Sequence, residues 1–283
     1  PKIITSSQDR SKGMGLIGMA FGLGMIFGPA IGGYGQSLGH AAPGLLAAGL
    51  SVLNLVSAYF ILPESLRHEH RMTRSFWPFG HMVDALAHPE LRPLMLVWAI
   101  APFAFAGYTV ALPLWAAATL GWQPRDLGRF FAVVGIVAAL VQGGLFRVLT
   151  RLVGDRALLI AGMFGMAVAI GAVPFLAHTA TLYLWTVVLA FSNSIMSPAA
   201  TGLVSTFAAA NEQGTVLGVA QSLGALGRGA GPEVTGEVYD GASPLVAFLV
   251  AGGVMLAGWA ASLGVPKTKR REHALRSKDL FSA

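Results

Sequence analysis

Long stretches of this sequence contain no charged residue, and they constrain the fold more than any other feature. The first stretch runs from Gly13 to Pro63. A helix that crosses the hydrocarbon core of a bilayer needs about 20 apolar residues, so this stretch can hold two spans joined by a turn within residues 35–43. Only 11% of the residues are charged and the mean hydropathy is +0.65, whereas soluble domains carry about 25% charged residues. The sequence therefore predicts an all-α membrane protein.

The same search predicts six more spans, which makes eight in total. They lie in residues 93–124, 130–146, 157–211 (two spans, separated at 177–181), 213–241 and 241–266. Cysteine is absent, which excludes thiolate metal sites, and the histidines show no spacing typical of a metal site. The sequence also lacks a Gly-x4-Gly-Lys-Ser/Thr phosphate loop. We therefore expect no metal and no cofactor.

A regular series of glycines lies in the first apolar stretch. The pattern Gly-x8-Gly-x3-Gly-Pro-x2-Gly-Gly is formed by Gly15, Gly24, Gly28, Pro29, Gly32 and Gly33. At about 100° per residue these glycines fall on two narrow faces of a helix. Small residues allow close helix contacts in lipid, and Pro29 predicts a bend. We expect this helix to serve as a bending and packing element.

This spacing resembles, at every position, the antiporter motif on the fifth transmembrane helix of drug/proton antiporters of the major facilitator superfamily. The branch that it resembles includes tetracycline and multidrug exporters. The resemblance implies the major facilitator fold of twelve helices in two halves, acting as a monomer when full length. Its partners would be the lipid bilayer, protons and a small amphipathic substrate. The alternative is a glycine-rich packing helix of some other membrane protein.

The glycine pattern has a second, weaker copy near the end of the chain. Gly28-Pro29 recurs as Gly231-Pro232, and at the same offset Gly15, Gly24 and Gly33 match Gly218, Gly227 and Gly236. Six predicted spans fit within this offset, and a six-helix unit repeated in parallel is the arrangement of the two major facilitator halves. We therefore interpret the eight spans as helices 5–12 of twelve, in an amino-terminally truncated chain. A genuine eight-helix protein is the alternative.

This interpretation divides the chain into four parts. Residues 1–62 would be the remnant of the N-terminal half with helices 5 and 6, and residues 63–90 a cytoplasmic linker between the halves. Residues 91–266 would be the C-terminal six-helix half, and residues 267–283 a basic cytoplasmic tail. All 19 lysines and arginines except Arg125, Arg129 and Arg228 fall on one side of this arrangement. By the positive-inside rule, both ends of a multi-pass protein of the cell membrane then lie in the cytoplasm.

Charged residues inside a predicted span mark possible functional groups. Arg228 lies midway along the eleventh family helix, beside the Gly231, Pro232 and Gly236 repeat, and a cation there needs a partner. Glu233, a group on the absent helices, an anionic substrate or backbone carbonyls could each satisfy it. Glu233 and Glu237 stand one turn apart and repel each other. One of them could bind a proton, so Arg228, Glu233 and Glu237 form a candidate relay, unless the two glutamates simply face water.

The resemblance also implies where substrate and gating residues lie. Helices 7 and 10 line the cavity in this family, and the candidates there and on helix 8 are Tyr108, Trp115, Gln142, Trp185, Asn193 and Met196. The aromatic residues could instead be interfacial anchors, and Asn193 could bond across helices. The loop with Arg147, Arg151, Asp155 and Arg156 resembles a degenerate copy of the family's cytoplasmic gate, with Thr150 at a position usually acidic. A basic loop with a tight glycine turn is the alternative.

The function that these features favour is proton-coupled efflux of a small amphipathic compound by alternating access. An importer or symporter of the same fold would share every feature described so far, because fold does not fix direction or substrate. The chain by itself could also be a fragment that cannot transport. A membrane enzyme would need convergent catalytic groups at one depth, and the spans hold too few. The positive charge has a simpler explanation in the membrane than in nucleic-acid binding, and we expect no nucleic-acid partner.

Overall fold

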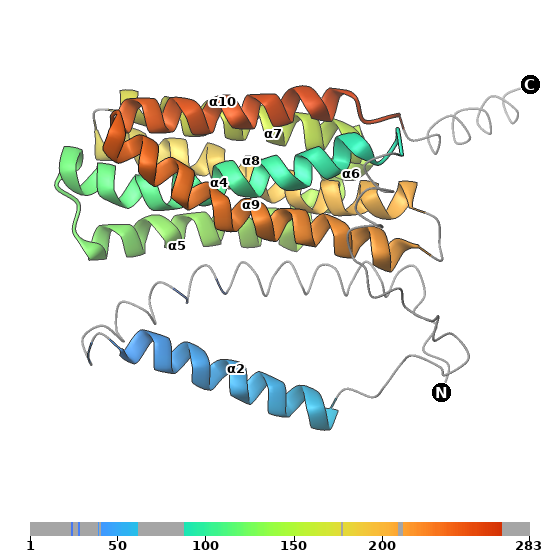
Figure 1. Cartoon of the computed structure of the whole chain (residues 1–283), viewed down its shortest axis with the longest axis horizontal. Helices are drawn as coiled ribbons and strands as arrows, with labels where there is room; N and C mark the ends of the chain where they lie inside the picture. The colour runs from blue at the N-terminus through green and yellow to red at the C-terminus, as the bar shows by residue number, and fades with distance from the viewer. Residues whose placement is uncertain are drawn as a thin grey trace, which may run out of the picture.

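The structure is a computed structural model that describes Gly24, Gly28, Gly39 and residues 41–61, 88–176, 178–208 and 212–267. Within these residues every element is helical (Figure 1). The elements are α2 (Ala42–Ile61), α4 (Arg92–Leu120), α5 (Pro124–Leu140), the π-helical turn η2 (Val141–Leu145), α6 (Phe146–Val153), α7 (Asp155–Ala172), the 3-10 turn η3 (Val173–Phe175), α8 (Thr179–Phe207), α9 (Gln213–Gly241) and α10 (Pro244–Leu263). Because α5, η2 and α6 follow one another without a break, the described residues form seven long helices.

The prediction of a multi-span helical protein is confirmed, although the count of eight spans is not. Six helices in the described part of the chain are long and apolar enough to cross a membrane. The seventh, α9, falls outside that group because it is less apolar: it is rich in glycine and polar residues and carries four charged ones, Arg228, Glu233, Glu237 and Asp240. The first predicted span lies outside the described residues except for Gly24 and Gly28, which are helical.

One span is much longer than the sequence search predicted. Residues 130–146 were expected, but the observed candidate span runs from Arg125 to Val153. The predicted span ends at charged residues, whereas in the structure Arg129 and Arg147 lie inside the helix near its two ends. Arginine can extend its charged head toward water while its stem stays on apolar surface. A charge near the end of a span therefore does not end the helix.

Proline and glycine set the helix boundaries. Pro124 and Pro244 occupy the first position of α5 and α10, where a missing amide costs nothing. Ser243 caps α10 by accepting a hydrogen bond from the Val246 amide at 3.3 Å. Gly121 ends α4 with φ of 66°, a left-handed conformation that glycine adopts without strain.

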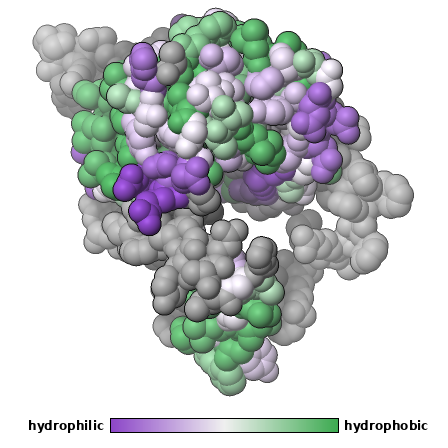
Figure 2. All heavy atoms as spheres, turned by 90° about the vertical axis from the view of Figure 1, so that its left-hand side faces the viewer, coloured by the Kyte–Doolittle hydropathy of each residue, from purple (hydrophilic) through white to green (hydrophobic). Residues whose placement is uncertain are grey.

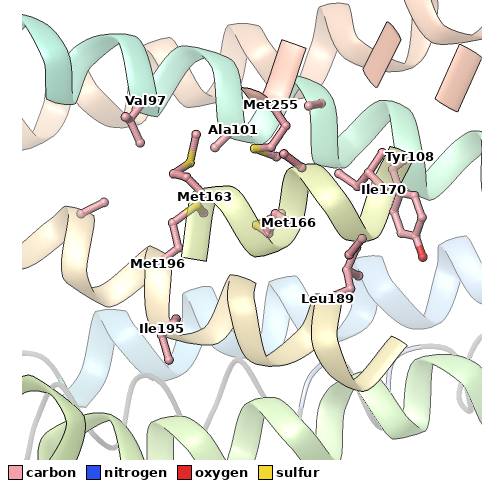
Figure 3. Close-up of a cluster of buried hydrophobic side chains, with 14 of the residues drawn as sticks. Val97, Ala101, Tyr108, Met163, Met166, Ile170, Leu189, Ile195, Met196 and Met255 are labelled. Atoms are coloured by element: carbon pink, nitrogen blue, oxygen red, sulfur yellow. The ribbon is translucent and has the colours of Figure 1, made fainter. Parts of the chain in front are cut away.

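The core of the bundle lies between α4, α7, α8 and α10, and methionine is prominent in it (Figure 3). Met163, Met166 and Met255 are fully buried, and Met196 is 7% exposed. Unbranched thioether side chains fill irregular gaps between helices. Glycines bring these helices close together, as where Gly252 of α10 meets the backbone of Gly171 on α7.

The two ends of the bundle differ in charge. At one end the starts of α4 and α7 meet the end of α10. A Cβ on Gly264, just after α10, would lie 3.5 Å from Pro93 of α4, and Arg156 of α7 donates a hydrogen bond to Val265. This end carries Arg92, Arg147, Arg151, Arg156 and Lys267. At the opposite end Arg129 pairs with Asp126 at 3.4 Å. Of the eight arginines and lysines in the described residues, five therefore lie at one end of the bundle. Which side of the membrane this end faces stays a prediction.

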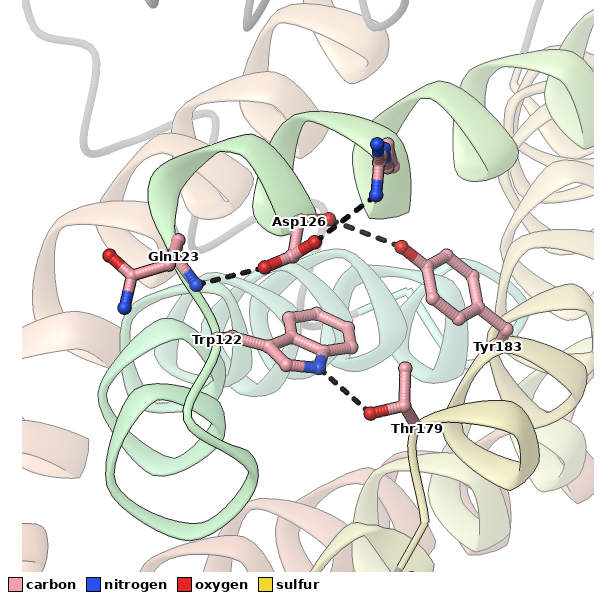
Figure 4. A network of polar contacts seen from close by, with 6 residues as sticks. Trp122, Gln123, Asp126, Thr179 and Tyr183 are labelled. Carbon is pink, nitrogen blue, oxygen red and sulfur yellow. Dashed lines mark hydrogen bonds and ion pairs between the residues drawn. The ribbon is translucent and has the colours of Figure 1, made fainter.

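Hydrogen bonds tie loops and helices together at the less basic end (Figure 4). The Trp122 indole donates to Thr179 Oγ1 at 3.2 Å, and the Tyr183 hydroxyl donates to the Asp126 carbonyl at 3.3 Å. Asp126 also accepts from the Gln123 amide at 3.0 Å, which caps α5. Figure 2 looks onto this end, where hydrophilic side chains gather in patches and hydrophobic ones cover much of the remaining surface. This distribution suits a bundle whose flanks face lipid and whose end faces water.

The helix α2 is apolar and has no buried residue. Its large side chains are strongly exposed, with Leu53 62% and Tyr59 82% accessible. A helix that is apolar all round belongs in lipid or against other helices. The assignment of residues 1–62 to one half, 63–90 to a linker and 267–283 to a tail lies mostly outside the described residues.

Candidate functional site

The second copy of the glycine pattern brings α9 into backbone contact with α4. A Cβ on Gly227 would lie 2.5 Å from the carbonyl oxygen of Ala99, and a Cβ on Gly231 would overlap the carbonyl oxygen of Phe103. One turn further on, the hydroxyl of Thr235 fills the space that a side chain on Gly107 would need. Because these contacts advance four residues at a time along both helices, α4 and α9 run in the same direction. No side chain larger than hydrogen fits at Gly227 or Gly231 without moving a helix.

The rest of the repeat does not take part in this contact. Among the described residues, no atom of a neighbouring helix lies within 4 Å of the position that a Cβ on Gly218 or Gly236 would occupy. Pro232 lies inside α9 and is half-buried. Within this second copy, therefore, the two central glycines pack against a neighbour and the two outer glycines do not.

The first copy of the pattern lies largely outside the described residues. Gly15, Pro29, Gly32 and Gly33 are not described, while Gly24 and Gly28 are helical and exposed. Among the described residues, no neighbouring atom lies within 4 Å of a Cβ built on either glycine. Their counterparts Gly227 and Gly231 show what such positions do when a partner helix is present. Close packing of the first copy remains a prediction.

Arg228 lies about halfway along α9 and extends back over the preceding turn. Its Nη1 atom is 3.3 Å from the position of a Gly224 Cβ, and Cε3 of Trp98 on α4 is 3.4 Å from that same position. Side chains on a helix point toward its N-terminus, so a glycine four residues earlier leaves room for the arginine. The guanidinium and the indole ring are therefore neighbours across the α4/α9 contact.

Two hydrogen-bond donors at this place have no acceptor among the described residues. The Trp98 indole nitrogen is buried and has no hydrogen-bond partner there. Within the same part of the chain no carboxylate forms an ion pair with Arg228, and Arg228, Glu233 and Glu237 are all exposed. The structure thus does not bring together the predicted relay of Arg228, Glu233 and Glu237. Sequence reasoning missed Trp98 and Gly224, because only the fold places them beside the arginine.

Four of the six predicted substrate residues pack between helices. Tyr108 and Trp115 are 2% and 4% exposed and meet the ring of Phe248 on α10 edge to face. The Trp185 indole donates to the Ala169 carbonyl on α7 at 3.1 Å. Met196 packs against Gly162 of α7, where the two Cβ positions are 2.7 Å apart. In this conformation these side chains hold helices together instead of offering a surface to a ligand.

The other two predicted substrate residues are partly exposed. Asn193 of α8 and Gln142 lie next to packed surfaces but are not buried. Gln142 lies in the π-helical turn η2, together with Gly143 and Gly144. Single π-helical turns inside α-helices occur often at functional sites, because the wider turn changes the direction of nearby side chains. Gln142 and Asn193 therefore remain the polar candidates for substrate contact.

The predicted gate residues lie at the basic end of the bundle. Arg156 donates from Nε to the Val265 carbonyl at 2.6 Å and from Nη2 to the Leu263 carbonyl at 2.9 Å. Asp155 Oδ2 lies 3.2 Å from the position of a Cβ on Gly202 of α8. Arg147 and Arg151 are exposed. Arg156 therefore caps the C-terminus of α10, where a cation is favourable.

A groove of about 430 Å³ opens between α7 and α10. Its lining is apolar apart from Arg156 and includes Ile160, Phe164 and Trp259. None of the predicted substrate residues lines it. Among the described residues, no group of three or more histidine, aspartate or glutamate side chains is arranged to hold a metal ion.

Long apolar helices packed through tight glycine contacts define a multi-pass helical membrane protein. The family model of the Major Facilitator Superfamily matches residues 4–232 and 145–281. This chain belongs to the Major Facilitator Superfamily. Since members of this family are transporters, the membrane-enzyme alternative is excluded.

Two relatives are named as drug-resistance proteins. The chain is 27% identical over 275 residues to multidrug resistance protein 2 of Bacillus subtilis, which covers 96% of this chain and 68% of that protein. It is 29% identical over 238 residues to the class C tetracycline resistance protein of Escherichia coli, covering 83% and 60%.

A solved structure shows the same fold. The crystal structure of the human organic anion transporter MFSD10 (TETRAN) superposes with a TM-score of 0.75 at 25% identity, covering 91% of this chain and 64% of that one. The chain thus spans 60% to 68% of the length of these three relatives.

Proposed function

We propose that the protein containing this chain exports a small amphipathic compound in exchange for protons. The observation that carries this proposal is the antiporter pattern at Gly15 to Gly33, whose second copy at Gly218 to Gly236 brings two parallel helices into backbone contact. Family membership and the relatives that are named as multidrug and tetracycline resistance proteins support the same function. The proposed location is the cell membrane, with both chain ends in the cytoplasm and a monomer as the working unit.

Alternating access gives the helices distinct roles in this mechanism. The two halves would rock against each other about a substrate site near the middle of the bilayer. The α4/α9 contact would move as one rigid unit, because its glycines leave no room for sliding. Gln142 and Asn193 would contact the substrate, and Arg147, Arg151, Asp155 and Arg156 would hold helix ends together in one state.

Proton coupling would involve the charged groups within α9. Arg228, Glu233 and Glu237 are the described candidates, and they lie on the same helix at increasing distance from its middle. Intramembrane charges mark ion pathways in many transporters. In this mechanism a proton that binds near Glu233 or Glu237 would bias the bundle toward one of its two states.

Purified full-length protein in liposomes tests the proposal. A pH-sensitive dye inside the liposomes would report proton movement when tetracycline or ethidium is added, with a protonophore as the control. We expect proton flux that depends on the added compound and runs opposite to it. Flux in the same direction would favour a symporter of the same fold. No compound-dependent proton movement would contradict the proposal.

A further inference from the structure

The groove between α7 and α10 opens on an exposed, apolar flank of the bundle. Both helices are long and apolar enough to span a membrane, and they lie side by side (Figure 1). The groove is lined by Arg156, Ala157, Ile160, Ala161, Phe164 and Trp259. Its volume of about 430 Å³ is that of a small ligand pocket. In a bundle that spans the membrane, an exposed apolar surface of this kind faces the acyl chains of the lipids.

The groove extends over the depth of about one leaflet. Arg156 is the second residue of α7, and Phe164 lies two helical turns further along. At 1.5 Å per residue the two are about 12 Å apart along the helix, whereas half of the hydrocarbon core is about 15 Å thick. The rings of Phe164 and Trp259, with centroids 5.5 Å apart, join the two helices across the groove. The groove therefore runs from the end of the span toward the middle of the membrane, as a lipid acyl chain does.

The charged side chain of the groove is held in a fixed direction. Arg156 donates from Nε to the Val265 carbonyl at 2.6 Å and from Nη2 to the Leu263 carbonyl at 2.9 Å. These two bonds use one edge of the guanidinium, which carries five N–H groups in all. Among the described residues no acceptor bonds to Nη1. The edge formed by Nη1 and Nη2 can therefore donate paired hydrogen bonds, and this geometry matches a phosphate group.

A second cation lies at the same end of the groove. Lys267 is exposed and follows Val265, the acceptor of the Arg156 bond, by two residues. The Cα atoms of Val265 and Lys267 are thus within about 7 Å of each other. Basic pockets between membrane helices bind anionic lipid headgroups in other membrane proteins. The charge at this end of the groove therefore complements a lipid whose headgroup is negative.

We propose that the groove binds an anionic phospholipid from the leaflet at the basic end of the bundle. One acyl chain lies along Ile160, Ala161 and Phe164, and the phosphate accepts hydrogen bonds from Arg156. A partner helix fits this groove less well, because helices associate in lipid through small residues, whereas Ile160, Phe164 and Trp259 are large. The site is separate from the proposed substrate contacts at Gln142 and Asn193.

Two phospholipids with identical acyl chains test the preference for a negative headgroup. Dioleoylphosphatidylglycerol carries a net negative charge, and dioleoylphosphatidylcholine carries no net charge. Native mass spectrometry of the purified full-length protein would measure the dissociation constant of each lipid. We expect the wild type to bind phosphatidylglycerol about threefold to tenfold more tightly, because the choline ammonium offsets the attraction of the phosphate to Arg156 and Lys267.

A bulky side chain in the groove tests where the acyl chain lies. Ala161 is exposed and lines the groove, so an indole at this position fills the groove without entering the core. Ala161→Trp should weaken both lipids by at least about tenfold, since the burial of two or more methylene groups is lost. Ala257→Trp is the matched control, because Ala257 is an exposed alanine of α10 that does not line the groove. This control should bind both lipids as the wild type does.

Three charge variants test the headgroup contacts. Arg156→Gln should weaken phosphatidylglycerol by at least about tenfold, because a charge-assisted hydrogen bond is lost. Lys267→Gln leaves the bonds between Arg156 and α10 in place, and should weaken phosphatidylglycerol by about threefold with little change for phosphatidylcholine. Arg125→Gln lowers the net charge equally at the opposite end of the bundle and should bind both lipids as the wild type does. If Arg156→Gln does not fold, Lys267→Gln and Ala161→Trp decide the question.

Three results would overturn the inference. The first is an Ala161→Trp variant that binds both lipids as the wild type does, and the second is a wild type that binds the two lipids equally well. The third is a dimer that Ala161→Trp dissociates without any change in lipid affinity, which would show that a second copy fills the groove. None of these measurements depends on proton movement in liposomes, so the lipid site and the proposed function can fail separately.

Discussion

Gly231 and Gly236 both lie on α9 but differ in their contacts with the neighbouring helix. Gly231 faces the backbone carbonyl of Phe103, whereas at Gly236 no neighbouring helix in the described part of the chain comes within 4 Å of the Cβ position. In a helix interior, alanine is better than glycine by about 1 kcal/mol. We therefore expect Gly236→Ala to leave stability unchanged or raise it. Gly231→Ala should lower stability by about 1–3 kcal/mol, since a backbone cannot yield to the added methyl group.

Thermal unfolding of the two purified variants in detergent would test this contrast. Both variants replace glycine by alanine in α9, so both gain the same helix propensity. The difference between their unfolding temperatures therefore reports the α4/α9 contact. Equal unfolding temperatures for Gly231→Ala and Gly236→Ala would show that the helices do not touch there.

Arg156 illustrates how a residue predicted for one role can be engaged in another. Its hydrogen bonds to Val265 and Leu263 satisfy carbonyls at the end of α10. Hydrogen bonds that involve a charged group contribute about 1.5–3 kcal/mol. Arg156→Ala should therefore destabilise the protein by about that amount, whereas Arg151→Ala, which removes an exposed side chain, should change stability by less than about 0.5 kcal/mol. A gate without a capping role would instead show lost transport with unchanged unfolding for Arg156→Ala.

At the scale of the element, the π-helical turn η2 is a feature that can be removed. A π-helical turn holds one more residue than an α-helical turn between the same flanks. Deleting Gly143 should convert η2 into regular α-helix and keep the registers of α5 and α6. Deleting Val137 from the regular part of α5 should rotate everything beyond it by about 100°.

Size-exclusion profiles and unfolding temperatures of the two deletions would test this prediction. We expect the Gly143 deletion to stay folded and to lose transport, because Gln142 then changes direction. The Val137 deletion should fail to fold. If the Gly143 deletion is as damaging as the Val137 deletion, the turn is not an inserted residue in an otherwise regular helix.

Most elements could be predicted from the sequence because hydropathy alone constrains them. Absence of charge over 20 residues places a helix in lipid. The ends of α4 at Leu120 and of η3 at Phe175 follow from Gly121 and Pro174 nearby. Hydropathy could not place the ends of the span from Arg125 to Val153, since arginine there is tolerated at depth. It also could not predict η2, because nothing in Val141–Leu145 distinguishes a π-helical turn from an α-helical one.

The candidate site was harder to predict than the elements. Arg228 stood out because a charge inside an apolar span is rare, and the structure places it beside Trp98, a residue that no sequence pattern indicates. Tyr108, Trp115, Trp185 and Met196 were chosen for their residue type and their helix. Which face of a helix points to a cavity depends on neighbouring helices, and the sequence does not specify these neighbours.

At the scale of the whole molecule, the bundle has one basic end and one end that is much less basic. The chain contains no cysteine, so single cysteines can report which end faces the cytoplasm. We expect Lys267→Cys to react with a membrane-impermeant maleimide only after cells are opened, and Ala242→Cys, in the turn between α9 and α10, to react in intact cells. The reverse pattern would show that the positive-inside interpretation is wrong.

The central claim is that the protein couples the outward movement of an amphipathic compound to the inward movement of protons. Its most direct test is uphill transport by the purified full-length protein in liposomes. An imposed pH gradient should concentrate a labelled compound on the more acidic side beyond its equilibrium distribution. Inverting the gradient should invert the direction of accumulation, and a protonophore should abolish it. Accumulation that never exceeds the equilibrium distribution under either gradient would contradict the account.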